Sequence, residues 1–227
     1  MKILRILKNI LRKFKGIYLK RKLTNRNFTI VSNNCWGGFV YKTFNLEYNS
    51  PFIGLFLFAP DYINLLKNFK NIINNELIFI NPEESRYKDK LIEYGTFETY
   101  PIGKLDDGVE IHFLHYTSKK EAKEKWNKRV QRIDMNNLLV KFSDRDLCSE
   151  ELIYEFNKLK FKNKLCFTAK EYKNSNTIVL KEFKGKECVE NEWNYYKKYI
   201  DIVNIINSLK EDSIIYKDRD NYLEVLS

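Results

Sequence analysis

The chain has 227 residues, which is enough for one hydrophobic core, with or without a division into two lobes. Its composition is 44% apolar, 15% aromatic and 31% charged with only 8 Gly and 4 Pro, which is typical of a globular protein with few long linkers. No run of about eighteen apolar residues occurs, so a transmembrane helix is excluded. The first residues lack the apolar core and cleavage site of a signal peptide, so we expect a cytoplasmic protein.

The net charge of +10 belongs to the beginning of the chain. Ten Lys and Arg lie within residues 1–26, which contain no Asp or Glu. The chain has 40 basic and 30 acidic residues in all, so residues 27–227 hold 30 of each sign. A neutral body offers few net charges for phosphate neutralisation. We therefore expect no nucleic-acid partner.

Residues 1–26 are predicted to form a basic amphipathic helix. At about 100° per residue, the apolar side chains from Ile3 to Tyr18 fill one arc and the Lys and Arg side chains fill the opposite arc. A helix of this kind suits an anionic membrane surface, and residues 1–22 predict a peripheral position on the inner face of the cell membrane. The alternative is a helix that docks on the body with Lys at its rim.

Residues 27–227 are predicted to form one α/β domain in which strands alternate with helices. In chain order, the pattern predicts strand 28–32, helix 35–45, strand 53–58, helix 61–74, strand 77–80, helix 84–94, strand 97–100, strand 109–115, helix 119–133, strand 137–142, helix 148–159, strand 164–168, strand 177–180 and helix 190–208. This order favours a three-layer α/β fold, with a largely parallel or mixed sheet flanked by helices.

Polar clusters follow three of the predicted strands. The clusters are Ser32, Asn33, Asn34 and Cys35 after the first, Ser143, Asp144, Arg145 and Asp146 after strand 137–142, and Thr168 to Lys170 after strand 164–168. Ligands of open α/β sheets bind beyond the carboxyl ends of the strands, so the clusters predict one shared cleft. The same residue types also serve as turns and helix caps, and that alternative stays open.

Both histidines lie in the predicted strand 109–115. On a strand, positions 112 and 115 face opposite sides of the sheet. His115 lies at the carboxyl end and is the candidate general acid or base, since the pKa of histidine is naturally near neutrality. His112 is predicted to be a core histidine with satisfied hydrogen bonds.

Other chemistries find little support in the sequence. Asp106 and Asp107 in a glycine-bounded loop could hold a divalent cation, but a solvated turn is favoured, so no metal site is predicted. Cys35 lacks a glycine elbow and has Trp36 beside it, which disfavours a nucleophile. The four cysteines form no CxxC pair, so neither structural zinc nor a disulfide framework is expected. P-loop, Rossmann and zinc-protease motifs are absent, and no cofactor is indicated.

Four stretches of the chain resemble a known bacterial family, DUF1919. The stretches are SNNCWGGFVYKTFNLEYNSPFIGLFLFAPDYINLLKN, YPIGKLDDGVEIHFLHYTSKKEAKEKWNKRV, NNLLVKFSDRD and CFTAKEY. The resemblance covers about residues 28–184, in matching order and spacing. Members of the family are often labelled as exopolysaccharide or capsule biosynthesis proteins. The resemblance thus implies a role in surface-polysaccharide assembly, and it supplies no catalytic residue.

The resemblance and the clusters together predict a transferase that acts on an activated or lipid-linked sugar, of acetyl, glycosyl or phosphoglycosyl type. His115 would deprotonate the acceptor, with Asp144 or Asp146 orienting the imidazole or the sugar. The predicted substrate-binding residues are Ser32, Asn33, Asn34, Trp36, Ser143 and Arg145. Among them Arg145 would bind an anionic donor, and Trp36 would stack on a sugar face. The alternative is a non-catalytic accessory or glycan-binding protein of the same machinery.

Overall fold

The computed structural model describes residues 14, 16–105, 108–173 and 175–209, together with the backbone of 214–217 and 222–225. Within the predicted N-terminal helix, residues 16–21 are helical, and residues 1–13 and 15 lie outside the described residues. Asp106 and Asp107 also lie outside them. None of the described helices is both long enough and apolar enough to cross a membrane.

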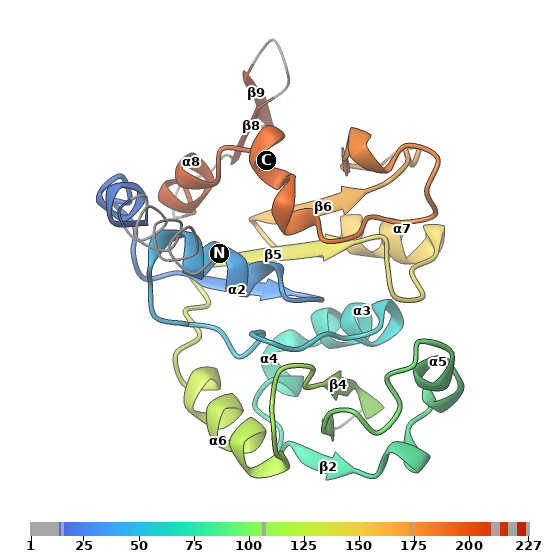
Figure 1. Cartoon of the computed structure of the whole chain (residues 1–227). Helices are drawn as coiled ribbons and strands as arrows, with labels where there is room; N and C mark the ends of the chain where they lie inside the picture. Colours follow the sequence, from blue (N-terminus) through green and yellow to red (C-terminus); the bar gives the residue numbers. More distant parts are fainter. Residues whose placement is uncertain are drawn as a thin grey trace, which may run out of the picture.

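The described chain alternates strands with helices from residue 29 onward (Figure 1). The elements are β1 (Thr29–Ser32), α2 (Trp36–Phe44), α3 (Ala59–Lys67), α4 (Phe69–Ile72), β2 (Ile78–Ile80), the 3-10 turn η1 (Pro82–Glu84), α5 (Lys88–Glu93), β3 (Ile102–Lys104), β4 (Glu110–His112), α6 (Lys119–Val130), β5 (Leu138–Ser143), α7 (Glu150–Lys158), β6 (Lys164–Thr168), β7 (Ile178–Val179), the 3-10 turns η3 (Lys181–Phe183), η4 (Glu192–Asn194) and η5 (Tyr196–Lys198), α8 (Ile202–Asn207), β8 (Ile214–Lys217) and β9 (Tyr222–Val225).

A parallel sheet in the order β1-β5-β6-β7 forms the centre of the fold. β1, β5 and β6 are buried on both faces because successive side chains alternate between two cores. Ile30 and Leu139 pack with α2 and α8 on one face, whereas Val31 and Val140 pack with α3 and α7 on the other. The predicted three-layer α/β arrangement is therefore confirmed.

A smaller antiparallel sheet, β2-β3-β4, lies on the far side of α3 and α4 and is accompanied by α5 and α6 (Figure 1). One apolar cluster runs from the α3 face of the parallel sheet to Phe113 and Trp126. The close packing of this sheet explains Gly103 in β3. A Cβ at that position would lie 2.6 Å from Leu77 Cδ1 and 2.9 Å from a Phe113 ring carbon, so a larger residue would force the packing apart.

Two predicted strands are wrong, for reasons that lie in the backbone. In 53–58 only Phe56 makes a bridge, to His112, because Gly54 turns the chain with a φ of 71°. Residues 97–100 form a turn, and the strand begins after Pro101, at Ile102. Residues 53–58 are apolar because they are buried between elements rather than paired along their length, whereas Glu98 and Thr99 of the second segment are exposed.

Three predicted helices are interrupted. Helix 61–74 divides into α3 and α4 at Asn68, where φ is −131° and ψ is 41°. Helix 84–94 becomes η1 and α5. Helix 190–208 becomes η4, η5 and α8, with Asn191 in the left-handed region at a φ of 48°. The predicted helix 119–133 is confirmed as α6, whose Ser118 Oγ accepts a hydrogen bond from the Glu121 backbone N–H.

Candidate functional site

The polar residues that follow β1 and β5 meet because these strands are parallel neighbours. The Asn34 side-chain amide donates to Ser143 Oγ at 3.2 Å and to Glu192 Oε1 at 2.7 Å. Lys141 Nζ donates to Asn34 Oδ1 at 3.2 Å, to Ser143 Oγ at 3.1 Å and to the Glu192 carboxylate. Ser143 Oγ donates to Asn33 Oδ1 at 3.3 Å. We call these five residues the buried network.

Every member of the buried network is enclosed, and the Lys141 and Glu192 side chains are fully buried. Burial opposes ionisation of Glu192, but Lys141 and Asn34 outweigh it and hold the pKa of this carboxyl below its usual value. The ion pair therefore joins β5 to η4, which lies more than forty residues further along the chain. Glu192 Oε2 and Asn33 Nδ2 have no hydrogen-bond partner among the described atoms.

Ser32 and Trp36, which are also predicted to bind substrate, support the turn that follows β1. Ser32 Oγ donates to the Asn34 carbonyl at 2.7 Å and accepts from the Gly37 N–H at 3.3 Å. The Trp36 backbone N–H donates to Asn34 Oδ1. The Trp36 indole is enclosed between the rings of Phe167 and Tyr196. Trp36 thus presents no ring face at the surface of this structure, because it fills the core beneath α2.

The Ser143–Asp146 turn is held by its own charged groups. The Asp144 carboxylate accepts from the backbone N–H groups of Ala169 at 2.7 Å and Val189 at 2.9 Å, so it ties the end of β6 to the segment before η4. Burial raises the pKa of Asp144, although these two donors oppose the shift. Arg145 Nε donates to Asp146 Oδ2 at 2.8 Å, and both side chains are partly exposed. Burial raises the pKa of Asp146, and Arg145 opposes that shift.

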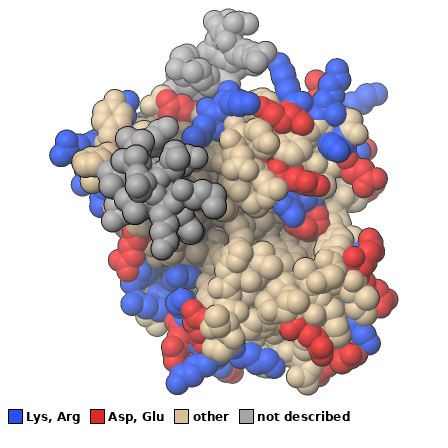
Figure 2. Space-filling model, viewed as in Figure 1, with Lys and Arg blue, Asp and Glu red and all other residues tan. Residues whose placement is uncertain are grey.

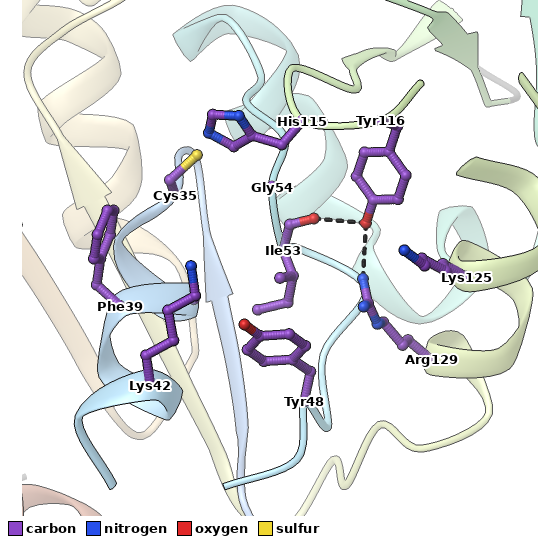
Figure 3. A pocket seen from close by; sticks show the side chains of 11 residues that line it. Cys35, Phe39, Lys42, Tyr48, Ile53, Gly54, His115, Tyr116, Lys125 and Arg129 are labelled. Carbon is purple, nitrogen blue, oxygen red and sulfur yellow. Dashed lines mark hydrogen bonds between the residues drawn. The ribbon is translucent and has the colours of Figure 1, made fainter. Parts of the chain in front are cut away.

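An open pocket of about 410 Å³ lies between α2 and α6 (Figure 3). We call it the basic pocket, because Lys42, His115, Lys125 and Arg129 line it and, among the described residues, no carboxylate does. Its other lining residues are Cys35, Gly38, Phe39, Tyr48, Ile53, Gly54 and Tyr116. Over the face shown in Figure 2, by contrast, basic and acidic side chains lie interspersed. The pocket is therefore a local concentration of positive charge on a body that is neutral overall.

The cations of the basic pocket are oriented by aromatic neighbours. The Tyr116 hydroxyl donates to the Ile53 carbonyl at 2.7 Å and accepts from Arg129 Nη1 at 2.7 Å (Figure 3). The Arg129 guanidinium lies 5.1 Å from the centre of the Tyr48 ring. Among the described residues Arg129 pairs with no carboxylate, whereas Lys125 pairs with Glu121. Part of the positive charge in the pocket is thus free to bind an anion.

The two histidines lie in different surroundings, but not because they face opposite sides of one strand. β4 ends at His112, and His115 lies on the turn that follows, where its N–H donates to the Gly54 carbonyl at 2.9 Å. The exposed His115 side chain lines the basic pocket. His112 is buried among aromatic rings, including Phe56 at 4.7 Å, and burial lowers its pKa to about 3. Its ring nitrogens have no partner among the described atoms, which corrects the prediction that they would be satisfied.

Cys35 stands at the start of α2, between the buried network and the basic pocket. Its Sγ lies 3.8 Å from the Leu55 carbonyl, which it contacts as a weak donor. Burial raises the pKa of the thiol to about 11, so it is protonated at neutral pH and a poor nucleophile on its own. Across the described residues, no group of three or more His, Cys, Asp or Glu is arranged to hold a metal ion.

The structure thus divides the predicted site residues between two places. It brings Asn33, Asn34 and Ser143 together, with Ser32, Trp36 and the Asp144–Asp146 turn adjacent, while His115 lines the pocket on the other side of Cys35. Lys141 and Glu192 are not among the predicted site residues, although a lysine within the apolar run LLVKF signals a buried charge that needs a partner. Lys42, Lys125 and Arg129 are not among them either, because they look like ordinary surface cations of amphipathic helices.

Comparison with known proteins gives a family and a relative. The model of the family described as "Domain of unknown function (DUF1919)" matches residues 6–210. A Haemophilus influenzae protein described as "Uncharacterized protein" is 40% identical over 154 residues, which cover 68% of this chain and 68% of the relative. The matched region includes the buried network and every residue of the basic pocket.

Proposed function

The chain belongs to the DUF1919 family, and from that premise and the basic pocket we propose that it is a transferase of surface-polysaccharide assembly. It takes an anionic, activated or lipid-linked sugar as donor and transfers a group to a sugar hydroxyl. The polysaccharide context comes from the sequence resemblance, and the choice of transfer chemistry comes from the pocket.

The observation that carries the proposal is the combination of three cations and one histidine around an open pocket. Its volume of about 410 Å³ lies within the range of small-molecule sites, about 300–1,000 Å³. Phosphate groups are the anions that Lys and Arg side chains bind best in such a setting. A donor whose leaving group is a phosphate matches this lining, because negative charge grows on that phosphate as the bond breaks.

In the proposed reaction His115 takes the proton of the acceptor hydroxyl. The acceptor oxygen forms a bond to the transferred group while the bond between that group and a phosphate oxygen breaks. The phosphate leaves with the electron pair of that bond, and Lys42 and Arg129 stabilise its charge. Arg145 and Asp146, which are paired and partly exposed, are the remaining candidates for contact with the donor or the acceptor.

The proposed place of action is the inner face of the cell membrane. The sequence of residues 1–22 predicts basic and apolar side chains on opposite arcs of a helix, and these would suit anionic headgroups and the acyl boundary respectively. Membrane attachment would concentrate the enzyme near lipid-linked glycans. Vesicles with and without anionic lipid, incubated with full-length protein and sedimented, test this part independently of catalysis.

Complementation of a deletion strain tests the proposed function. We expect His115→Ala and Lys42→Gln to lose most surface polysaccharide, measured chemically on washed cells. Lys128→Gln removes the same charge from the exposed surface of α6, away from the pocket, and should complement fully. If His115→Ala and Lys42→Gln both restore polysaccharide at normal protein levels, the proposal fails.

A non-catalytic accessory role is the second candidate, and one observation favours it. Asp144 is committed to two backbone N–H groups, and the buried network lies away from the surface, so most of the predicted site residues hold structure. On this alternative the protein binds a glycan or recruits a glycosyltransferase. His115→Ala would then complement, whereas removal of exposed aromatic side chains would not.

A further inference from the structure

Two aromatic side chains stack on one another beside the basic pocket. The rings of Phe39 on α2 and Trp193 on η4 stack with centroids 4.7 Å apart and planes 11° from parallel. Phe39 is 37% exposed and Trp193 is partly exposed. We call this pair the aromatic platform. Exposed stacked rings of this size offer a face on which a further flat ring can stack.

The buried network holds the aromatic platform in place. η4 directs Glu192 inward to Lys141 and Asn34, and the next residue, Trp193, packs outward against Phe39. The short 3-10 turn has little regular structure of its own to fix it. The fully buried ion pair therefore contributes to fixing where the Trp193 ring lies. Glu192 and Asn34 are in this sense positioning residues.

The platform and the pocket are continuous. Phe39 lines the pocket, and Lys42, three residues further along α2, has its Nζ 5.6 Å from the centre of the Phe39 ring. Figure 3 shows Phe39 and Lys42 projecting from α2 on one side and Lys125 and Arg129 projecting from α6 on the other. A ligand in this pocket would thus meet an aromatic face at one end and cations on both sides.

We infer that the phosphate-bearing ligand of the basic pocket is a nucleoside diphosphate, the leaving group of a nucleotide-activated sugar. Its base would stack on the aromatic platform, and its phosphates would lie between Lys42, Lys125 and Arg129. This inference rests on the proposed function and selects one of its two donor classes. A lipid diphosphate fits less well, because Ile53 is the sole aliphatic side chain among the described residues that line the pocket. Bases stack readily on aromatic side chains, and phosphates pair with Lys and Arg.

Binding to the full-length protein tests this inference without knowledge of the reaction. UDP, CDP, ADP, GDP, inorganic pyrophosphate and farnesyl diphosphate are titrated by calorimetry and by tryptophan fluorescence. Trp36 and Trp126 are buried, so Trp193 is the tryptophan that an outside ligand can quench directly. We expect at least one nucleoside diphosphate to bind about tenfold more tightly than pyrophosphate and to quench a signal that Trp193→Phe removes.

Two variants measure separately what the base and the phosphates contribute to affinity. Phe39→Ala should weaken the nucleoside diphosphate about fivefold or more, the lower end of what one stacked base contributes, and leave pyrophosphate affinity unchanged. Lys42→Gln should weaken both ligands. Ile92→Ala removes a comparably exposed apolar side chain from α5 and should change neither affinity. Thermal unfolding of each variant checks that it is folded.

The outcomes distinguish the inference from the proposed function. Equal affinity for pyrophosphate and all nucleotides, with no effect of Phe39→Ala, overturns the nucleotide and leaves the anionic pocket standing. Tight binding of farnesyl diphosphate alone also overturns it, in favour of a lipid-linked donor. If neither pyrophosphate nor any diphosphate binds to the folded protein, the inference and the proposed function both fail.

Discussion

The buried network and the basic pocket lie on either side of Cys35 and use similar residue types in opposite ways. In the network, Lys141 faces a carboxylate and two further acceptors and is closed off from solvent. In the pocket, Arg129 faces aromatic rings and a hydroxyl, with the solvent open beside it. Polar side chains that satisfy one another hold a fold together. Polar side chains of one sign, left around an open space, suit a ligand of the other sign.

The residues that look most like a ligand site in the sequence are not the residues that line most of the pocket. Asn33, Asn34 and Ser143 are the residues that the sequence marks most clearly as a ligand site, yet they are buried in mutual hydrogen bonds. On the inference above they act through η4, whose Trp193 stacks on the pocket residue Phe39. Substitutions in the buried network should therefore lower the stability of the protein, whereas substitutions in the basic pocket should weaken ligand binding.

The largest effect is expected from Glu192→Gln. This change leaves the Lys141 ammonium buried without a counter-charge, and breaking a buried pair on one side reduces the free energy of unfolding by about 3–5 kcal/mol. Urea unfolding of the variant and the native protein measures the difference at the extrapolated zero concentration of urea.

Two controls show whether the ion pair is the cause. Glu190→Gln, at an exposed neighbouring position, should leave the free energy of unfolding unchanged. Lys141→Met combined with Glu192→Leu should be more stable than Glu192→Gln, because no charge remains buried. A native-like stability of Glu192→Gln would show that the pair is solvated, and the contrast between network and pocket would disappear.

The two histidines provide a smaller, pH-dependent test of the same contrast. The folded-state pKa of His112 is about 3, below its value of about 6.5 in an unfolded chain. As the pH falls from 6.5 towards 3, the unfolded chain takes up a proton that the folded chain refuses, so stability is lost in this window. The loss is about 1.4 kcal/mol per pH unit, or about 2.5 kcal/mol by pH 4.5.

The measurement compares native protein with His112→Leu and His115→Gln by urea unfolding between pH 7 and 4.5. The difference between native and His112→Leu stability should change across this range by the amount above, whereas His115→Gln should follow the native curve. Only the change with pH is compared, because the leucine also alters packing against Phe56. Parallel curves for native and His112→Leu would mean that water or a hydrogen bond reaches the buried ring.

The fold was largely predictable because its parallel strands are continuous apolar runs. β1, β5, β6 and β7 all lie within one or two residues of their predicted positions, since burial on both faces leaves a strong pattern. The errors fall where burial occurs without regular pairing. Residues 53–58 are as apolar as a strand, but Gly54 turns the chain and long-range packing decides the outcome. The local sequence carries no information about that long-range packing.

The candidate site was predictable only in part. The clusters after β1 and β5 were expected to converge, and they do, because parallel strands end at the same edge. Whether they face solvent depends on η4, which covers them from a distant part of the chain. The pocket depends on the placing of α6 opposite α2, so Lys42 and Arg129 meet through tertiary structure alone. A surface cation on a helix gives no signal of the helix it will face.

The smallest effect on stability, and the clearest effect on binding, is expected from the pocket cations. Lys42→Gln and Lys125→Gln change exposed side chains and should leave the free energy of unfolding unchanged within error. Lys42→Gln should weaken pyrophosphate binding about tenfold, as expected when one charged partner of a phosphate is removed. Lys125 is shared with Glu121, so its loss should matter less than that of Lys42. Lys128→Gln, measured by the same calorimetry, controls for net charge. Equal weakening in all three variants would show that the anion responds to the overall charge rather than to this pocket.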